Sequence, residues 1–146
     1  MPTEGPHAPR MLDGAELVAF VATTDLERSD DFYGGVLGLH HIETTPFANV
    51  YDVGGTTLRV TLVQQRTPAP YTVLGWKVAD IAATVATLTA GGIVMKRVDG
   101  MNQDEAGIWT APVTESGALR GASGGARIAW FEDPDGNVLS VGQMDP

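Results

Sequence analysis

The sequence predicts an α+β domain built from two tandem βαβββ modules. Two observations support this fold class. A short apolar, β-prone segment runs into a capped helix and then into further β-prone segments, and the same order returns in the second half of the chain. The two predicted helices also have nearly the same length, from Asp25 to Gly38 and from Asp80 to Gly92, and each ends at glycine, the usual C-terminal residue.

We expect module one at about residues 14–65. Its first strand leads into a helix that Thr24 or Asp25 caps, and Glu27 can close a capping box on Thr24. Glycines 54 and 55 supply the turn between its last two strands. The expected strands of module one cover residues 17–21, 39–44, 48–53 and 58–63.

We expect module two at about residues 72–145. Asp80 caps its helix, which carries Ile81, Val85 and Leu88 on one face. The turn of its last hairpin, at residues 133–136 (DPDG), has the composition of a structural turn. The expected strands of module two cover residues 73–78, 93–98, 127–131 and 138–141.

Two segments fall outside this repeat. Residues 1–13 contain three prolines and no apolar period, which predicts a flexible N-terminal arm before a single domain at residues 14–145. Residues 99–126 are a long glycine-rich loop that is either a mobile insertion or a lid over a binding site. Ile108 and Trp109 favour the lid, because large apolar side chains on a loop need a surface to cover.

Composition excludes several classes of protein. The 146 residues, of which 43% are hydrophobic, suffice for one domain with a core. The net charge of −9 disfavours nucleic-acid binding. Apolar runs are too short to cross a membrane and the N-terminus lacks a signal-peptide stretch, so we expect a cytoplasmic protein without a membrane partner.

Without cysteine, a metal ion would need His, Asp or Glu ligands. His41 and Glu43 lie two residues apart on a predicted strand and share a face, with His40 opposite, but no third ligand is visible. We interpret them as polar residues on the outer face of a half-exposed strand. Asp104 and Glu105, in the long loop, are interpreted as solvated charges.

Two motifs carry a resemblance to a known family. Residues 25–29 (DLERS) with Phe32 and Tyr33, and residues 132–137 (EDPDGN), resemble motifs of the vicinal oxygen chelate superfamily. This superfamily includes glyoxalase I, extradiol dioxygenases, fosfomycin-modifying enzymes and bleomycin-binding proteins. The resemblance covers about residues 14–144 and implies curled mixed sheets that form a ligand cup, often completed in a homodimer. It does not imply one chemistry, since the fold hosts many reactions and some members only bind.

In relatives that use a metal, four side chains from the first and last strand of each module hold the ion. The matching positions here are Val18, Arg59, Val73 and Ser140, and a slip of two residues would replace Arg59 by Thr61. Valine offers no ligand atom and a guanidinium repels a cation. We therefore expect no metal and no other cofactor in the cup.

The cup is expected to have apolar walls with a few hydrogen-bonding groups. Arg59 either clamps a carboxylate or phenolate of a ligand or pairs with Glu16, whereas Lys77 extends toward the rim. Trp76 and Trp130 are expected in the core. The expected ligand-contacting residues are Phe20, Phe47, Tyr51, Arg59, Thr61, Val73, Gly75, Lys77, Trp109 and Ser140.

Three hypotheses for function follow, and whether the protein is an enzyme stays open. The first is a metal-free protein that sequesters a small, partly aromatic molecule such as an antibiotic, with an acidic surface that favours a cationic ligand. The second is a lyase or isomerase in which Arg59 or Lys77 stabilises an oxyanion and Glu16 accepts a proton. The third is a partly filled cup that acts through a partner protein.

Overall fold

A computed structural model describes residues 11–112 and 125–144 of the chain. The first module forms a four-stranded mixed sheet in the order β1-β4-β3-β2. The edge strand β1 runs parallel to β4, and the other neighbours are antiparallel. The strands of this sheet are β1 (Val18–Thr23), β2 (His40–Thr44), β3 (Ala48–Val53) and β4 (Thr56–Leu62).

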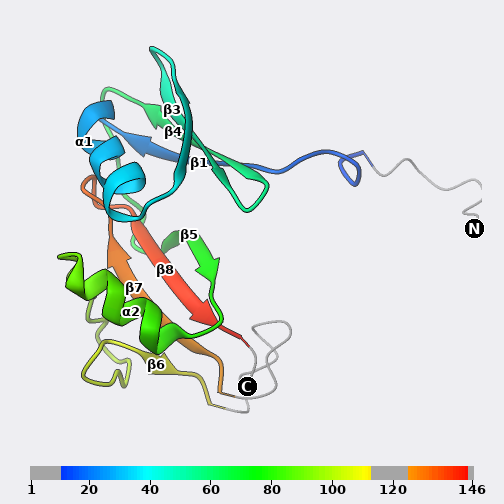
Figure 1. Ribbon diagram of the computed structural model, residues 1–146. Helices are drawn as coiled ribbons and strands as arrows, with labels where there is room; N and C mark the ends of the chain where they lie inside the picture. Colours follow the sequence, from blue (N-terminus) through cyan, green and yellow to red (C-terminus); the bar gives the residue numbers. More distant parts are fainter. Residues whose placement is uncertain (1–10, 113–124, 145–146) are drawn as a thin grey trace, which may run out of the picture.

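The second module repeats this arrangement in the order β5-β8-β7-β6, again with a parallel edge pair, β5 and β8. Its strands are β5 (Thr72–Lys77), β6 (Trp109–Thr110), β7 (Arg127–Glu132) and β8 (Val138–Gln143). Figure 1 shows the two sheets one above the other, each with one helical segment beside it. The predicted α+β class with two tandem modules is confirmed, and both sheets are open.

The helices begin where the sequence predicts. The Asp25 side chain caps α1 (Leu26–Asp30) and the Asp80 side chain caps α2 (Ile81–Ala90), each accepting a bond of 3.0 Å from a backbone N–H. The first helix is not one regular element, however. After α1 the chain widens into a π-helical segment, η1 (Asp31–Val36), in which the N–H of residue 37 bonds back to residue 32.

One face of each sheet packs against helical residues and forms the core. Leu58 and Val60 of β4 are buried on this face, whereas Arg59 between them points to the opposite face and is half-buried. Leu139 of β8 is buried in the same way, with the half-buried Ser140 next to it. The core joins both modules in one cluster, whose largest fully buried side chains are Tyr33, Tyr51, Phe131, Leu58, Ile81 and Leu139.

The turn after β7 ties module two to module one. The buried carboxylate of Asp135 accepts hydrogen bonds from the Thr23 hydroxyl (2.6 Å) and the Thr24 backbone (3.1 Å), and it pairs with Arg28 (2.6 Å). Arg66, from the segment between the modules, donates to the Asp135 backbone carbonyl. Burial alone would raise the pKa of Asp135, but these hydrogen bonds and the Arg28 charge together lower it below its usual value.

A second carboxylate in this turn strengthens the tie. Asp133 accepts a bond of 2.6 Å from the Tyr33 hydroxyl, and burial together with this carboxylate raises the pKa of Tyr33 above its usual value. The Asn137 side chain donates to the Ala22 carbonyl of β1 (2.9 Å). The carboxylate oxygens of Asp133 and Asp135 therefore accept hydrogen bonds from the protein itself. The structural interpretation of this turn therefore agrees with its contacts.

The second module departs from its predicted elements at two places. Residues 93–98 do not form a strand, although the Lys96 N–H donates to the Trp130 carbonyl. The described part of the long loop carries the short strand β6, and Ile108 is buried in the core cluster. Ile108 and Trp109, which favoured a lid, lie in the core cluster and in β6, whereas residues 113–124 of the loop lie outside the described residues.

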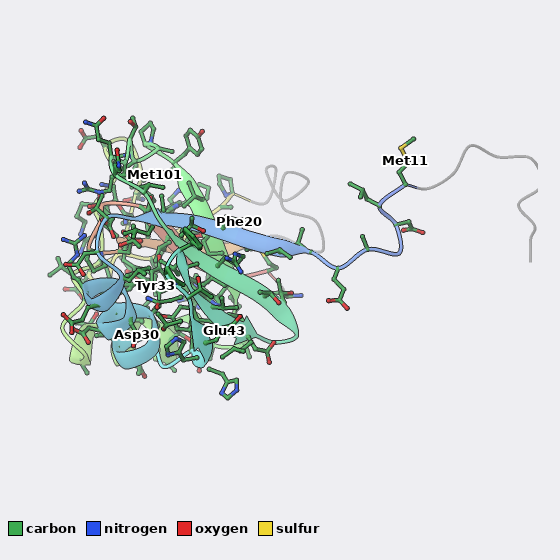
Figure 2. All side chains as sticks on the ribbon, turned by 90° about the horizontal axis from the view of Figure 1, so that it is seen from above. Met11, Phe20, Asp30, Tyr33, Glu43 and Met101 are labelled. Atoms are coloured by element: carbon green, nitrogen blue, oxygen red, sulfur yellow. The ribbon has the colours of Figure 1, made fainter. Side chains whose placement is uncertain are left out.

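The first side chains that the structure describes are exposed to solvent. Met11 stands far from the sheets in Figure 2, and Leu12 and Leu17 are exposed. Residues 1–10 of the expected arm lie outside the described residues. Among the described helices, none is long and apolar enough to span a membrane.

Candidate functional site in the second module

Each sheet has a second face, opposite to its helix, which we call the cup face. Strand alternation places Val18, Phe20 and Ala22 of β1 on the cup face of module one, with Arg59 and Thr61 of β4. The exposed fractions support this assignment, because Phe20 is 61% exposed whereas the next residue, Val21, is 6% exposed. The predicted cup-lining strands are therefore placed as the sequence indicated.

We call a set of residues that lie opposite one another on neighbouring strands a row. The two modules have equivalent rows, because their strands pair in the same order. In module one, Phe20 lies opposite Arg59, which lies opposite Val50. In module two, Gly75 lies opposite Ser140, which lies opposite Trp130. The same backbone arrangement thus presents two different sets of side chains.

A cavity of about 360 Å³ lies on the cup face of module two, a volume within the range of small-molecule sites. Gly75 lies closely against Ser140 at this cavity, since a Cβ at position 75 would lie 2.9 Å from the Ser140 hydroxyl oxygen. The lining residues are Thr72, Gly75, Trp76, Lys77, Ile128, Trp130, Ser140, Gly142 and Met144. Three of the expected ligand-contacting residues, Gly75, Lys77 and Ser140, are brought together here.

Two tryptophans form one side of this face. Trp109 of β6 lies opposite Ile128 of β7, and its ring centre is 6.2 Å from that of Trp130, with an angle of 40° between the rings. Trp130 itself lines the cavity and is not among the core residues, so its expected core position is wrong. The expected core position of Trp76 is confirmed by its packing against the core cluster.

Polar groups on the cup faces lack partners. The half-buried Arg59 forms no hydrogen bond or ion pair within the described parts of the chain, so the expected alternative of an Arg59–Glu16 pair is not present there. Glu16 precedes β1 and is exposed. The hydroxyl oxygen of Thr61 is buried and also has no hydrogen-bond partner among these residues.

Two aromatic residues expected at the ligand lie elsewhere. Tyr51 pairs with Leu58 and therefore faces the helix, where its hydroxyl donates to Asp30 at 2.7 Å. It is 0% exposed, and burial together with this hydrogen bond raises its pKa. Phe47 lies in the turn between β2 and β3 and is 70% exposed. Neither placement fits the predicted contact with a ligand in the cup.

A β-bulge changes the cavity wall. The pairing of β5 with β8 shifts register between Thr72 and Leu74, so that Thr72 lies opposite Val138 and lines the cavity. Val73, the expected wall residue, is 40% exposed and does not line this cavity. Strict alternation does not extend across a bulge, because the extra residue shifts the following side chains by one position.

The donor set does not fit a divalent metal. The positions that the resemblance assigns to the ion are Val18, Arg59, Val73 and Ser140, of which only the serine offers a ligand atom and one is a cation. Within the two described ranges, no group of three or more His, Asp or Glu side chains could hold an ion.

The two acidic segments that we considered as metal ligands have other contacts. His41 contacts the Glu43 backbone carbonyl and the Thr44 hydroxyl, and the carboxylate near its ring, at 3.6 Å, is that of Asp30 and not that of Glu43. The Asp104 carboxylate accepts bonds from two backbone N–H groups of its own loop. Neither arrangement brings several ligand atoms to one point.

Larger hollows lie on the helix side. One of about 700 Å³ is bounded by η1, residues 91–97 and the turn after β7, and one of about 920 Å³ runs along the outer surface of α2. Both are open grooves and contain none of the predicted site residues. We therefore take the smaller cavity on the cup face as the candidate site.

The fold and this site define the class of protein. Residues 16–141 match the Glyoxalase/Bleomycin resistance protein/Dioxygenase superfamily, and the chain belongs to this superfamily. No curated protein matches the chain.

Solved structures support the same fold at low sequence identity. A glyoxalase/bleomycin resistance protein/dioxygenase from Alicyclobacillus acidocaldarius is 16% identical, with a TM-score of 0.63, over 90% of this chain and 92% of that one. The fosfomycin resistance protein FosX from Listeria monocytogenes is 12% identical, with a TM-score of 0.63, over 89% and 93%. A lactoylglutathione lyase from Agrobacterium tumefaciens is 16% identical, with a TM-score of 0.59, over 89% and 93%. These similarities concern the fold alone.

Proposed function

We propose that this protein is a metal-free small-molecule-binding protein of the glyoxalase/bleomycin-resistance type. The observation that carries the proposal is the cavity of about 360 Å³ on the cup face of module two. It combines a tryptophan face, a glycine at position 75 and the Ser140 hydroxyl, a composition typical of pockets that orient small organic molecules. Trp109 beside Trp130 extends the aromatic surface on which a flat ligand would stack.

Sequestration of an antibiotic or an aromatic metabolite is the use that we propose for this pocket. Binding requires only shape and a few polar groups, and the described cup faces supply these. The alternative of a lyase or isomerase needs a proton acceptor near the substrate. The carboxylate expected in that role, Glu16, is exposed and lies outside β1, so this placement favours binding over catalysis.

A homodimer is part of the proposal. Val18 and Val73 on the two modules are each 40% exposed, and Phe20 is 61% exposed. A second copy that covers these apolar side chains would remove them from water, and such burial drives most homodimer interfaces. Sedimentation velocity at micromolar concentration tests this point, and a monomer at all concentrations would contradict it. The cytoplasmic location stays a prediction.

The pocket can be tested by filling it. We expect Gly75→Val to abolish the binding of aromatic compounds from a screened panel, because its side chain would occupy the space above Ser140. Gly35→Ala is the matched control, since a Cβ at position 35 meets no atom within 4 Å. Binding is measured by calorimetry with each hit. Hits that bind wild type and Gly75→Val with equal affinity would contradict the proposed site.

A further inference from the structure

The candidate cavity lies over small residues of two neighbouring strands. Gly75 of β5 lies opposite Ser140 of β8, and Lys77, two residues further along β5, lies opposite Gly142. All four residues line the cavity of about 360 Å³. Met144 lines it too and packs against Gly142, since a Cβ at position 142 would lie 2.7 Å from the Met144 methyl carbon. Among the described residues that line the cavity, Lys77 has the one long polar side chain.

The side chain of Lys77 lies on the cavity side of β5. Its neighbour Trp76 packs against the core cluster, and successive side chains of a strand point to opposite faces. Lys77 therefore shares the cup face with Gly75. Its ammonium group has no hydrogen-bond or ion-pair partner within residues 11–112 and 125–144. A ligand in the cavity thus meets a cation that no carboxylate of the described chain neutralises.

The Ser140 hydroxyl is a second free polar group in the same cavity. It also lacks a hydrogen-bond partner in the described parts of the chain. The buried hydroxyl oxygens without a partner there are those of Ser29 and Thr61, so the Ser140 oxygen is not shielded from solvent. A strand spacing of about 4.8 Å and a rise of about 3.3 Å per residue place the Cα atoms of Ser140 and Lys77 about 8 Å apart. One bridging oxygen atom of a ligand can reach both groups.

The polar side chains of the cavity mainly donate hydrogen bonds. The Lys77 ammonium and the Trp130 indole N–H only donate, whereas the Thr72 and Ser140 hydroxyls both donate and accept. No carboxylate, amide or imidazole side chain is among the described residues that line the cavity. A cationic ligand would meet a like charge here without a compensating carboxylate. A ligand with an anionic oxygen group would satisfy both Lys77 and Ser140.

The aromatic wall and the cation lie on opposite sides of the cavity. Trp130 is on β7 and Lys77 is on β5, with β8 between them, so their strands are about 10 Å apart. The Trp109 ring, 6.2 Å from that of Trp130, continues the aromatic wall away from β8. A flat ring that stacks on Trp130 therefore directs a substituent over Ser140 toward Lys77.

We propose that Lys77 and Ser140 form an anion subsite of this cavity, so that the ligand is an aromatic small molecule with an anionic oxygen group. The proposal rests on the proposed function and names the ligand class of the same site. The apolar side chains that we assign to the dimer, those of Val18, Phe20 and Val73, do not line the cavity, so the subsite uses none of them. The net charge of −9 favours a cationic ligand at long range, but salt screens that attraction, and Lys77 decides at contact distance.

Three probes with the same rings test the charge. Calorimetric titrations would compare 2-naphthoate, the neutral 2-naphthamide and the cationic 2-naphthylmethylammonium. We expect wild type to bind the naphthoate about ten times more tightly than the amide, and the ammonium least tightly, because a hydrogen bond between charged groups contributes about this much. Lys77→Met should reduce the ratio of naphthoate to amide affinity to about one without changing the affinity for the amide. The wild-type ratio should also fall in 1 M salt, since Lys77 is exposed.

Control variants separate the subsite from general charge and from a neighbouring hollow. Lys77→Arg keeps the charge and should retain the preference for the naphthoate. Arg127→Met removes an equal charge from the opposite face of β7, since Arg127 alternates with the lining residue Ile128, and should leave the ratio unchanged. Thr56→Val changes a hollow of about 310 Å³ between β5 and module one that Lys77 also borders, and it should have no effect. Circular dichroism verifies that each variant is folded.

Several results would overturn the subsite. They are equal affinity of wild type for naphthoate and amide, no binding of naphthoate at millimolar concentration, and the same loss of preference in Arg127→Met or Thr56→Val. A loss in Lys77→Met that accompanies dissociation of the dimer in sedimentation velocity would also overturn it and assign Lys77 to the contact between copies. Failure of the proposed function is distinguishable, since Gly75→Val would then leave the binding of all probes unchanged.

Discussion

The cup faces of the two modules differ although their backbones repeat. In module one, the edge position of the central row holds the large, exposed Phe20, and the middle position holds Arg59. In module two, the edge position is Gly75 and the middle position is Ser140, with Trp130 beyond it. A cavity therefore opens in module two next to an aromatic ring, where module one presents a charge next to an aromatic ring.

The two modules show that a duplicated fold can carry different side chains on equivalent faces. Strand pairing and the capped helices determine where the rows lie, and they leave the identity of each side chain free. Small residues, Gly75 and Ser140, occupy two neighbouring positions of the row in module two, whereas the larger Phe20 and Arg59 occupy the equivalent positions of module one. The cavity that carries the proposed function lies beside the row of module two.

The hairpin turns of the two modules should differ most in their effect on stability. We expect Asp135→Ala to lower the free energy of unfolding by about 3 kcal/mol or more, because Arg28 and the Thr23 hydroxyl lose a buried carboxylate. Asp52→Ala, at the end of β3 before the turn of module one, should cost less than about 1 kcal/mol, since its exposed carboxylate accepts a hydrogen bond only from the Gly55 N–H. Urea unfolding measures both, and equal losses would contradict this difference.

Neighbouring residues of β1 test which face belongs to the cup. Val21→Ala should lower the free energy of unfolding by about 2 kcal/mol, because this side chain is buried in the core. Phe20→Ala should change it by less than about 0.5 kcal/mol in the monomer, because most of this ring is exposed. Urea unfolding at low protein concentration measures the free energy of unfolding of both variants. A larger loss in Phe20→Ala would mean that the faces are assigned the wrong way round.

Gly75 and Ser140, which lie opposite each other in module two, allow a double-mutant test. We expect Gly75→Ala to cost about 1 kcal/mol, because the new Cβ would lie 2.9 Å from the Ser140 oxygen. In a Ser140→Ala background this crowding is absent, so the same change should cost nothing, which gives a coupling of about 1 kcal/mol. Thermal unfolding of the four proteins measures the coupling. Additive effects would show that the two positions do not meet.

Of these changes, lowering the pH is expected to have the smallest effect on the free energy of unfolding. The pKa of Asp135 is lowered in the folded protein, so its ionised form stabilises the fold above about pH 4, and this stabilisation is lost as the pH falls further. The difference in stability between wild type and Asp135→Asn should be constant above about pH 5 and shrink at lower pH. Unfolding titrations from pH 7 to pH 3 check the sign. A difference that grows on acidification would contradict the lowered pKa.

Much of this architecture follows from short-range signals. Asp25 and Asp80 are placed before apolar helical faces, and their capping bonds form as predicted. The expected strand at residues 48–53 coincides with β3. The π-helical turn in η1 and the absence of a strand at residues 93–98 had no such local signal.

The wrong predictions of residue positions at the site come from how the strands pair. Trp130 was expected in the core, yet the turn at residues 133–137 sets the hairpin register that places it opposite Ser140. The turn motif that sets this register was present in the sequence. Tyr51 faces the helix because it pairs with Leu58, and a shift by one residue would reverse its side. The bulge that brings Thr72 into the cavity wall depends on the alignment of β5 with β8, which no local pattern indicates.

The proposed function requires that the cup bind an organic ligand without a metal ion. Elemental analysis of the purified, untagged protein tests it, after incubation with zinc, nickel, iron and manganese and then desalting. With Val18, Arg59, Val73 and Ser140 at the metal positions, we predict near-zero occupancy. One tightly held ion per chain, lost in variants of these cup residues, would contradict the account and favour metal-dependent catalysis.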